Sequence, residues 1–180
     1  MKHFRKISIL LIILIFLSLI IYLSVNVHWG STTSERINFT YRDGLFYQRN
    51  SDELFTGKFT DTTDVVIEFE VSNGKKNGRF TCYFLEGGIE KEGIIINNKN
   101  EGTWKYYYDN GQVETIGSFY NNLPDGEWVS YYRNGETSIK GIYRQGMQIG
   151  NWSYYDKYGK LINIITFIDN VMKDKVLINI

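Results

Sequence analysis

Apolar residues follow two different patterns along this chain. Between Ile7 and Val27 they run almost without a break, and no charged side chain interrupts them. From residue 42 onward, short stretches rich in aromatic and β-branched residues alternate with turns that contain glycine and asparagine. The first pattern is typical of an apolar helix and the second of β-strands separated by turns. The chain is therefore predicted to combine one N-terminal helix with an all-β domain.

A glycine followed two positions later by an aromatic residue recurs every 24 residues in the β domain. The pairs are Gly78 and Phe80, Gly102 and Trp104, Gly126 and Trp128, and Gly150 and Trp152. A fixed period of this length indicates a repeat array in which each unit buries its apolar side chains against its neighbours. We expect each glycine to open a strand and each aromatic ring to fill the core.

Each unit is predicted to form a β-hairpin. The first strands cover 78–84, 102–108, 126–132 and 150–156, and the second strands cover 89–96, 113–120, 137–144 and 161–168. Asn110-Gly111 and Asn134-Gly135 lie between them, a pair that favours a type I′ turn, in which both central residues have positive φ. Further connections at 97–100, 121–124 and 145–148 link the units. The fold class is thus all-β, an elongated, twisted antiparallel meander of hairpins.

Glycines also interrupt three of the second strands, at Gly93, Gly117 and Gly141. A glycine inside a strand usually leaves room for a bulky neighbour or a bulge. We expect the Trp of the adjoining strand to occupy that space.

These patterns divide the chain into an N-terminal anchor at 1–29, a linker at 30–41 and a repeat domain at 42–180. Within the repeat domain, we place a capping unit at 42–77, four repeats at 78–101, 102–125, 126–149 and 150–173, and a half-repeat cap at 174–180. Asp174 replaces the glycine in this last cap, and Val176 replaces the aromatic residue.

The apolar N-terminal stretch matches the roughly 20 residues that a helix needs to cross a membrane. Lys2, Arg5 and Lys6 precede it, and no lysine or arginine follows until Arg36. This asymmetry favours a single-pass signal anchor with its N-terminus in the cytoplasm and the repeats outside. The alternative is a cleaved signal peptide, which would leave a secreted or periplasmic protein, but the segment lacks a good small-residue cleavage site.

Charge and residue types narrow the function classes. The formal net charge is +0, and acidic residues slightly outnumber basic ones beyond the N-terminal segment, which argues against nucleic acid as a partner. Both histidines, His3 and His28, precede the repeats, and we find no pattern for a catalytic base, a metal site or a cofactor. We interpret Cys82 as a strand residue without special reactivity. The chain is therefore predicted to be non-enzymatic.

Tyrosines form a second column three residues after the Gly-aromatic pairs, at Tyr83, Tyr107, Tyr131 and Tyr155. Strand alternation places this column on the face opposite the Trp column. It either stabilises the sheet or presents amphipathic rings to a partner, since tyrosine is enriched at interfaces. These four residues are our candidate binding residues.

The pattern Gly-x-Trp-x-x-Tyr-Tyr-x-x-Asn-Gly, read here from Gly126 to Gly135, resembles the MORN repeat variant of bacterial YwqK-family antitoxins. The resemblance covers about residues 42 to 170 and implies that the chain neutralises a toxin through protein contact. We therefore expect a membrane-anchored repeat protein that binds another protein as an antitoxin or immunity protein. The alternative is a structural envelope protein that binds polysaccharide or peptidoglycan.

Overall fold

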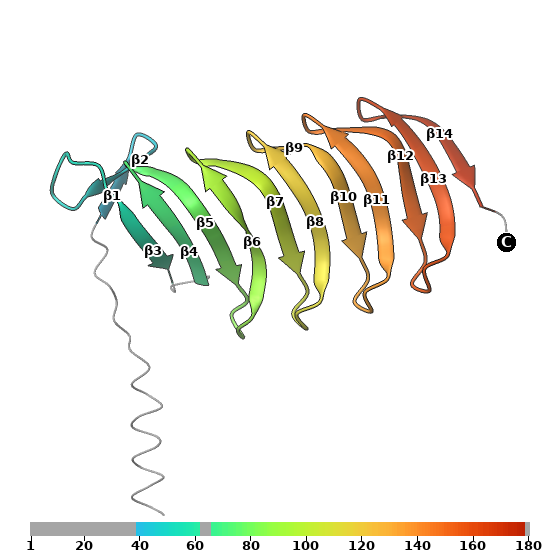
Figure 1. Ribbon diagram of the computed structural model, residues 1–180, viewed down its shortest axis with the longest axis horizontal. Helices are drawn as coiled ribbons and strands as arrows, with labels where there is room; N and C mark the ends of the chain where they lie inside the picture. Colours follow the sequence, from blue (N-terminus) through green and yellow to red (C-terminus); the bar gives the residue numbers. More distant parts are fainter. Residues whose placement is uncertain (1–38, 62–65, 179–180) are drawn as a thin grey trace, which may run out of the picture. The chain divides into compact units, whose positions relative to one another are not determined.

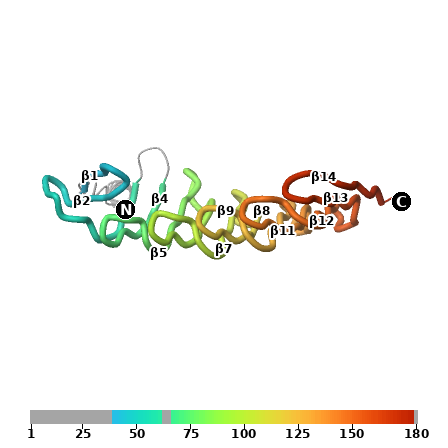
Figure 2. Tube along the Cα trace, turned by 90° about the horizontal axis from the view of Figure 1, so that it is seen from above, coloured from blue at the N-terminus to red at the C-terminus, as the bar shows by residue number. Residues whose placement is uncertain are grey.

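The computed structural model describes residues 39–61 and 66–178, which form antiparallel β-hairpins that follow one another in chain order (Figure 1). This described part contains a two-stranded sheet, β1-β2, and a 12-stranded sheet in which β3 to β14 are neighbours in sequence order, with β9 paired to β8 alone. Seen from above, the hairpins succeed one another from the first repeat to the last (Figure 2). The predicted meander of hairpins is confirmed.

The strands have the following bounds: β1 Phe39–Arg42, β2 Leu45–Gln48, β3 Gly57–Asp61, β4 Val66–Ser72, β5 Lys75–Tyr83, β6 Ile89–Ile96, β7 Lys99–Tyr107, β8 Val113–Tyr120, β9 Leu123–Pro124, β10 Gly126–Tyr131, β11 Thr137–Arg144, β12 Met147–Tyr155, β13 Leu161–Ile168 and β14 Val171–Leu177. The second strand of every repeat has the predicted bounds. Three of the first strands begin three residues before the repeat glycine.

The repeat glycine therefore does not open the strand in three of the four units, and this expectation was wrong. Gly102 lies inside β7 with a φ of +63°, a conformation that side chains other than glycine rarely adopt. The pairing of β6 with β7 jumps from Ile94↔Glu101 to Glu92↔Lys105, so that three residues of β7 face one residue of β6. The glycine thus forms a bulge, and the strands curve along their length (Figure 1).

The turns at the Asn-Gly pairs are not of the predicted type I′. Gly111 has a φ of +80°, whereas Asn110 is not in the positive-φ region. The amide of Gly111 donates to the Tyr108 carbonyl, and the Asn110 side chain accepts from the Gln112 amide, which makes a turn followed by a left-handed glycine. The type I′ pattern instead occurs at the other connections, for example at Asn97 and Asn98, with φ of +51° and +67°.

These tight turns are tied to the preceding repeat. The Oδ1 of Asn122 accepts a 2.6 Å hydrogen bond from the Asn100 amide, and the Asn122 amide donates back to the Asn100 carbonyl at 3.1 Å. Asn98 and Asn170 form the same clamp with residues 76 and 148. In the remaining repeat, Gly146 takes the place of the turn asparagine and Pro124 takes the place of its partner. The Gly146 amide still donates to the Pro124 carbonyl, but proline has no N–H to donate in return.

Each tryptophan of the repeats packs on a glycine of the preceding long strand, as the sequence predicts. A Cβ atom built on Gly93 would lie 2.2 Å from the Trp104 ring, and one on Gly117 would lie 2.1 Å from the Trp128 ring. The Trp104 Nε1 donates to the Ile94 carbonyl at 3.2 Å, which fixes the indole across the glycine. Trp104 is only 4% exposed although the sheet is its main support.

A second aromatic column, which the sequence analysis did not identify, separates the tryptophans. Phe119 contacts Trp104 and Trp128 edge to face, with ring centroids 5.9 Å and 5.2 Å apart. Tyr143 lies in the same way between Trp128 and Trp152, and Phe167 contacts Trp152. The core of the array is therefore a continuous row of rings on one face.

The two ends of the described sheet differ. At the N-terminal end, the β1-β2 hairpin covers the first strands with a phenylalanine cluster, in which Phe46 and Phe69 are buried and Phe39 packs against them. The strand β1 begins at Phe39, inside the predicted linker, and the ring of this residue belongs to the cluster. At the other end, every residue of β14 is exposed. No helix among the described residues has the length and apolarity to cross a membrane; the predicted anchor at 1–29 lies outside them.

Candidate binding face

The tyrosine column lies on the side of the sheet opposite the tryptophans. We call the side of Trp104, Trp128 and Trp152 the tryptophan face, and the side of Tyr83, Tyr107, Tyr131 and Tyr155 the tyrosine face. Trp104 contacts the rings of Phe80 and Phe119, whereas Tyr107, three residues later in the same strand, contacts Glu92. All four tyrosines are half-buried.

In the N-terminal half of the tyrosine face, the tyrosine hydroxyls are bound by carboxylates. The Tyr83 hydroxyl donates to Glu68 at 3.2 Å, and the Tyr107 hydroxyl donates to Glu92 at 2.7 Å. Burial, reinforced by the hydrogen bond to Glu92 and the charge of that carboxylate, raises the pKa of Tyr107 to about 12. These two phenols are therefore held neutral and already have a partner.

The C-terminal half lacks this arrangement. The residue fifteen positions before the tyrosine is Glu68 or Glu92 in the first two cases, but it is Ile116 before Tyr131 and Lys140 before Tyr155. Within the described residues, no hydrogen bond to a protein group engages the hydroxyl of either Tyr131 or Tyr155. The Lys140 ammonium lies near both tyrosines and is paired with Glu127 at 2.9 Å.

The surroundings of the tyrosines change in the same direction. The row that crosses the tyrosine face from β8 to β13 has apolar residues at its ends and polar ones between them: Ile116, Val129, Lys140, Ser153 and Ile164. Ile142 on the same face is 46% exposed. A region that combines exposed apolar residues, tyrosines and one paired lysine has the mixed composition of a protein interface.

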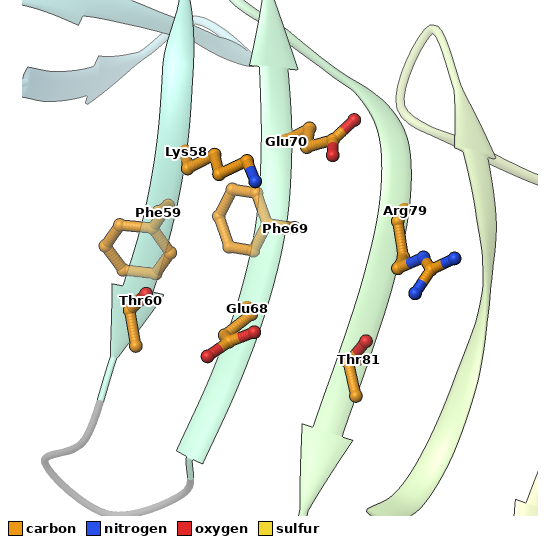
Figure 3. A pocket seen from close by; sticks show the side chains of 8 residues that line it. All are labelled: Lys58, Phe59, Thr60, Glu68, Phe69, Glu70, Arg79 and Thr81. Carbon is orange, nitrogen blue, oxygen red and sulfur yellow. The ribbon is translucent and has the colours of Figure 1, made fainter.

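The N-terminal half instead contains an open hollow of about 300 Å³ lined mainly by charged and hydroxyl side chains (Figure 3). Its lining comprises Lys58, Phe59, Thr60, Glu68, Phe69, Glu70, Arg79 and Thr81. Lys58 and Glu70 are cross-strand partners, yet no ion pair joins the four charged side chains in the described structure. This composition resembles a solvated rim more than an interface core.

A further tyrosine column holds adjacent repeats together, and the sequence analysis gave it no role. The hydroxyls of Tyr108 and Tyr132 each donate at 2.8 Å to a backbone carbonyl of the next repeat, that of Tyr131 and that of Tyr155. The 24-residue spacing of Tyr108 and Tyr132 was the available signal. These bonds position the backbone of the candidate binding tyrosines.

The described residues contain no cluster of three or more His, Cys, Asp or Glu side chains that could hold a metal ion. Cys82 is buried and its thiol lies 3.3 Å from Glu90. Burial and the neighbouring carboxylate raise the pKa of this thiol, which disfavours the reactive thiolate.

Comparison with known proteins identifies the repeats. Residues 100–122 and 124–145 match the family described as MORN repeat variant. The first matched segment covers β7 and β8 and the second covers β10 and β11, and they support a MORN repeat protein. No curated protein matches this chain.

Proposed function

We propose that this chain is a non-enzymatic MORN repeat protein that binds another protein through the C-terminal half of its tyrosine face. The observation that carries the proposal is the pair of half-buried tyrosines, Tyr131 and Tyr155, whose hydroxyls lack the carboxylate partner that Tyr83 and Tyr107 have. Repeats of this type are often involved in protein or membrane binding, which is consistent with such a role.

The physical basis of binding is the difference between bound and free hydroxyl groups. A tyrosine hydroxyl that already bonds to a carboxylate gains little from a partner, because the new bond would replace an existing one. A partner that bonds to the hydroxyl of Tyr131 or Tyr155 displaces only water. The two rings also add apolar contact area at a small cost in side-chain entropy. At roughly 4.8 Å per strand, the C-terminal half of the face from β8 to β14 is about 25 Å wide.

The proposal extends to the partner and its location. We propose that the partner is a toxin that the chain neutralises by occlusion, and that residues 7–27 anchor the repeats on the outer side of the membrane. The resemblance to YwqK-family antitoxins and the basic residues before the apolar stretch support these two points. A topology reporter fused after Ile180 would be active outside the cytoplasm if the orientation is right.

Site-specific crosslinking in the producing cell tests the binding face. A photoreactive phenylalanine derivative is placed at Tyr131 or Tyr155, and at Tyr143 on the tryptophan face as the matched control. We expect one protein to be crosslinked from residues 131 and 155 and none from residue 143. Crosslinks only to polysaccharide, or equal protein crosslinks from all three positions, would refute the proposal.

The double variant Tyr131→Ser/Tyr155→Ser then separates binding from folding. It is expected to lose capture of the crosslinked protein while its tryptophan fluorescence, which reports the tryptophan row, stays unchanged. The matched variant Tyr83→Ser/Tyr107→Ser removes the same groups from the charged half and is expected to retain capture. Retained capture by the first variant would show that these tyrosines do not bind the partner.

A further inference from the structure

The strand β14 presents apolar side chains and an unpaired edge together. In the described sheet it pairs with β13 alone. Met172 and Leu177 are 58% and 61% exposed, and Val176 is 47% exposed. These apolar side chains flank the charged segment Lys173-Asp174-Lys175 on an unpaired strand, and such an edge is open to pairing with another chain.

The hydrogen bonds to β13 show which backbone groups of β14 remain available. The Ile178 amide donates to the Ile162 carbonyl at 2.9 Å, and the register continues through Ile164↔Val176 and Thr166↔Asp174. Because backbone groups alternate in direction along a strand, those of Asp174, Val176 and Ile178 point toward β13. The N–H and C=O groups of Lys175 and Leu177 therefore point outward.

The side chains disfavour pairing of a second copy of this chain over the middle of β14. Two-fold antiparallel pairing of β14 with itself places like charges opposite one another when it is centred on residue 173, 174 or 175, whereas centring on residue 176 pairs Lys175 with Leu177 and avoids this. Like charges directly opposite one another destabilise a strand pair, and edge lysines commonly prevent such self-association. The two lysines against one aspartate instead favour an acidic strand.

The edge adjoins the C-terminal half of the tyrosine face. Val176 pairs with Ile164, so the two apolar side chains lie side by side on that face. Lys175 pairs with Ile165 and lies on the tryptophan face. A partner seated on the C-terminal half of the tyrosine face would reach this edge.

We infer that β14 accepts an extended strand of the protein partner, which adds to the sheet edge with an apolar side chain over Val176 and an acidic side chain beside Lys175. This inference rests on the proposed protein-binding function and adds a docking mode to it. Main-chain hydrogen bonds to Lys175 and Leu177 provide affinity, and the lysine charges select the strand.

Two labelled peptides of about eight residues test the edge: one alternates valine with glutamate, the other valine with lysine. Fluorescence anisotropy is measured with the full chain in detergent micelles. We expect the glutamate peptide to bind at least about tenfold more tightly than the lysine peptide. Lys175→Glu is expected to reverse this preference, and Lys175→Pro, which removes an outward N–H, is expected to weaken both peptides.

Matched controls separate the edge from the rest of the chain. Lys105→Glu reverses a charge in the middle of the sheet and is expected to leave the peptide preference unchanged. Equal binding of both peptides, or an unchanged preference in Lys175→Glu, would overturn the inference, as would dimerisation of the wild-type chain through β14. The Tyr131→Ser/Tyr155→Ser variant should still bind the glutamate peptide, so that a failure of the tyrosine face and a failure of the edge give different results.

Discussion

The two faces of the sheet differ in how strictly they repeat. On the tryptophan face, Gly93, Gly117 and Gly141 each lie under a tryptophan of the following strand, with almost the same spacing each time. On the tyrosine face, the equivalent positions 68, 92, 116 and 140 are Glu, Glu, Ile and Lys. The invariant face is the one that must pack, and the face that changes along the array is free to acquire a binding role.

The same contrast separates the tyrosines from one another. Tyr108 and Tyr132 repeat with identical hydrogen bonds and hold adjacent repeats together, so their role is structural. Tyr107 and Tyr131 share a repeat position but differ in their partners. Tyr107 bonds to the carboxylate of Glu92, whereas Ile116 occupies the equivalent position before Tyr131. Equivalent positions in a repeat protein can thus carry different functions.

Removal of a tryptophan should have the largest effect. Trp104→Ala deletes a ring that is 4% exposed and contacts Phe80 and Phe119, and it leaves a cavity in a core without a second layer. We expect a loss of about 3–5 kcal/mol in the free energy of unfolding, measured by urea denaturation. Thr103→Ala, at the exposed neighbouring position, should change it by less than about 0.5 kcal/mol. Similar effects of the two variants would contradict the assignment of the core.

The glycine under that ring should be the next most sensitive position. Gly93→Ala places a Cβ 2.2 Å from the Trp104 ring, and we expect overpacking to cost about 1–3 kcal/mol. In the Trp104→Ala background, the same substitution should cost nothing or stabilise slightly, because alanine is preferred over glycine in a strand. Additive effects in this double-mutant cycle would show that the ring and the glycine are not coupled.

The asparagine clamp offers a natural control within the same chain. Asn122→Gly keeps the positive φ but removes the side-chain bond to the Asn100 amide, and we expect a loss of about 1 kcal/mol. Gly146→Asn should bring no gain, because the corresponding residue, Pro124, has no N–H to donate. A clear gain from Gly146→Asn in thermal melting would show that the clamp depends on something else.

The hydroxyl groups of the tyrosine face should give the smallest effects. Tyr107→Phe removes the bond to Glu92 and should cost about 1 kcal/mol, whereas Tyr131→Phe should stay within about 0.5 kcal/mol. A comparable loss in both variants would contradict the difference between the two halves of the face.

The raised pKa of Tyr107 adds a dependence on pH. The folded chain keeps this proton up to about pH 12, whereas the unfolded chain loses it near the ordinary value of 10. Stability from this group is therefore fully present below pH 10 and is lost as the pH rises toward 12. Urea denaturation of wild type and Tyr107→Phe at several pH values should show a steeper decline for the wild type over this range.

Much of the fold could be predicted because its signals are local and repeated. The turn glycines and strand-forming residues bound 89–96, 113–120, 137–144 and 161–168 correctly. The same signals failed at Gly102, because strict alternation does not reveal a bulge inside a strand. They also failed at Asn110, whose side chain bonds to the backbone and stabilises a different turn.

The candidate site was predictable only in part. The spacing identified the column of Tyr83, Tyr107, Tyr131 and Tyr155, since repeats align equivalent positions. Which of these hydroxyls is bound depends on residues fifteen positions earlier, and that relation follows from strand pairing rather than from sequence proximity. The alternation of Phe119 with the tryptophans was hidden for the same reason.

The central claim is that the tryptophan face folds the chain and the C-terminal half of the tyrosine face binds its partner. The most direct measurement is the affinity of the crosslinked protein for Tyr131→Ser/Tyr155→Ser and for Tyr83→Ser/Tyr107→Ser, with the melting temperature of each variant recorded beside it. We predict that only the first variant loses binding, and that it melts cooperatively with its tryptophan signal intact. Equal affinity of the two variants for the partner would contradict the claim.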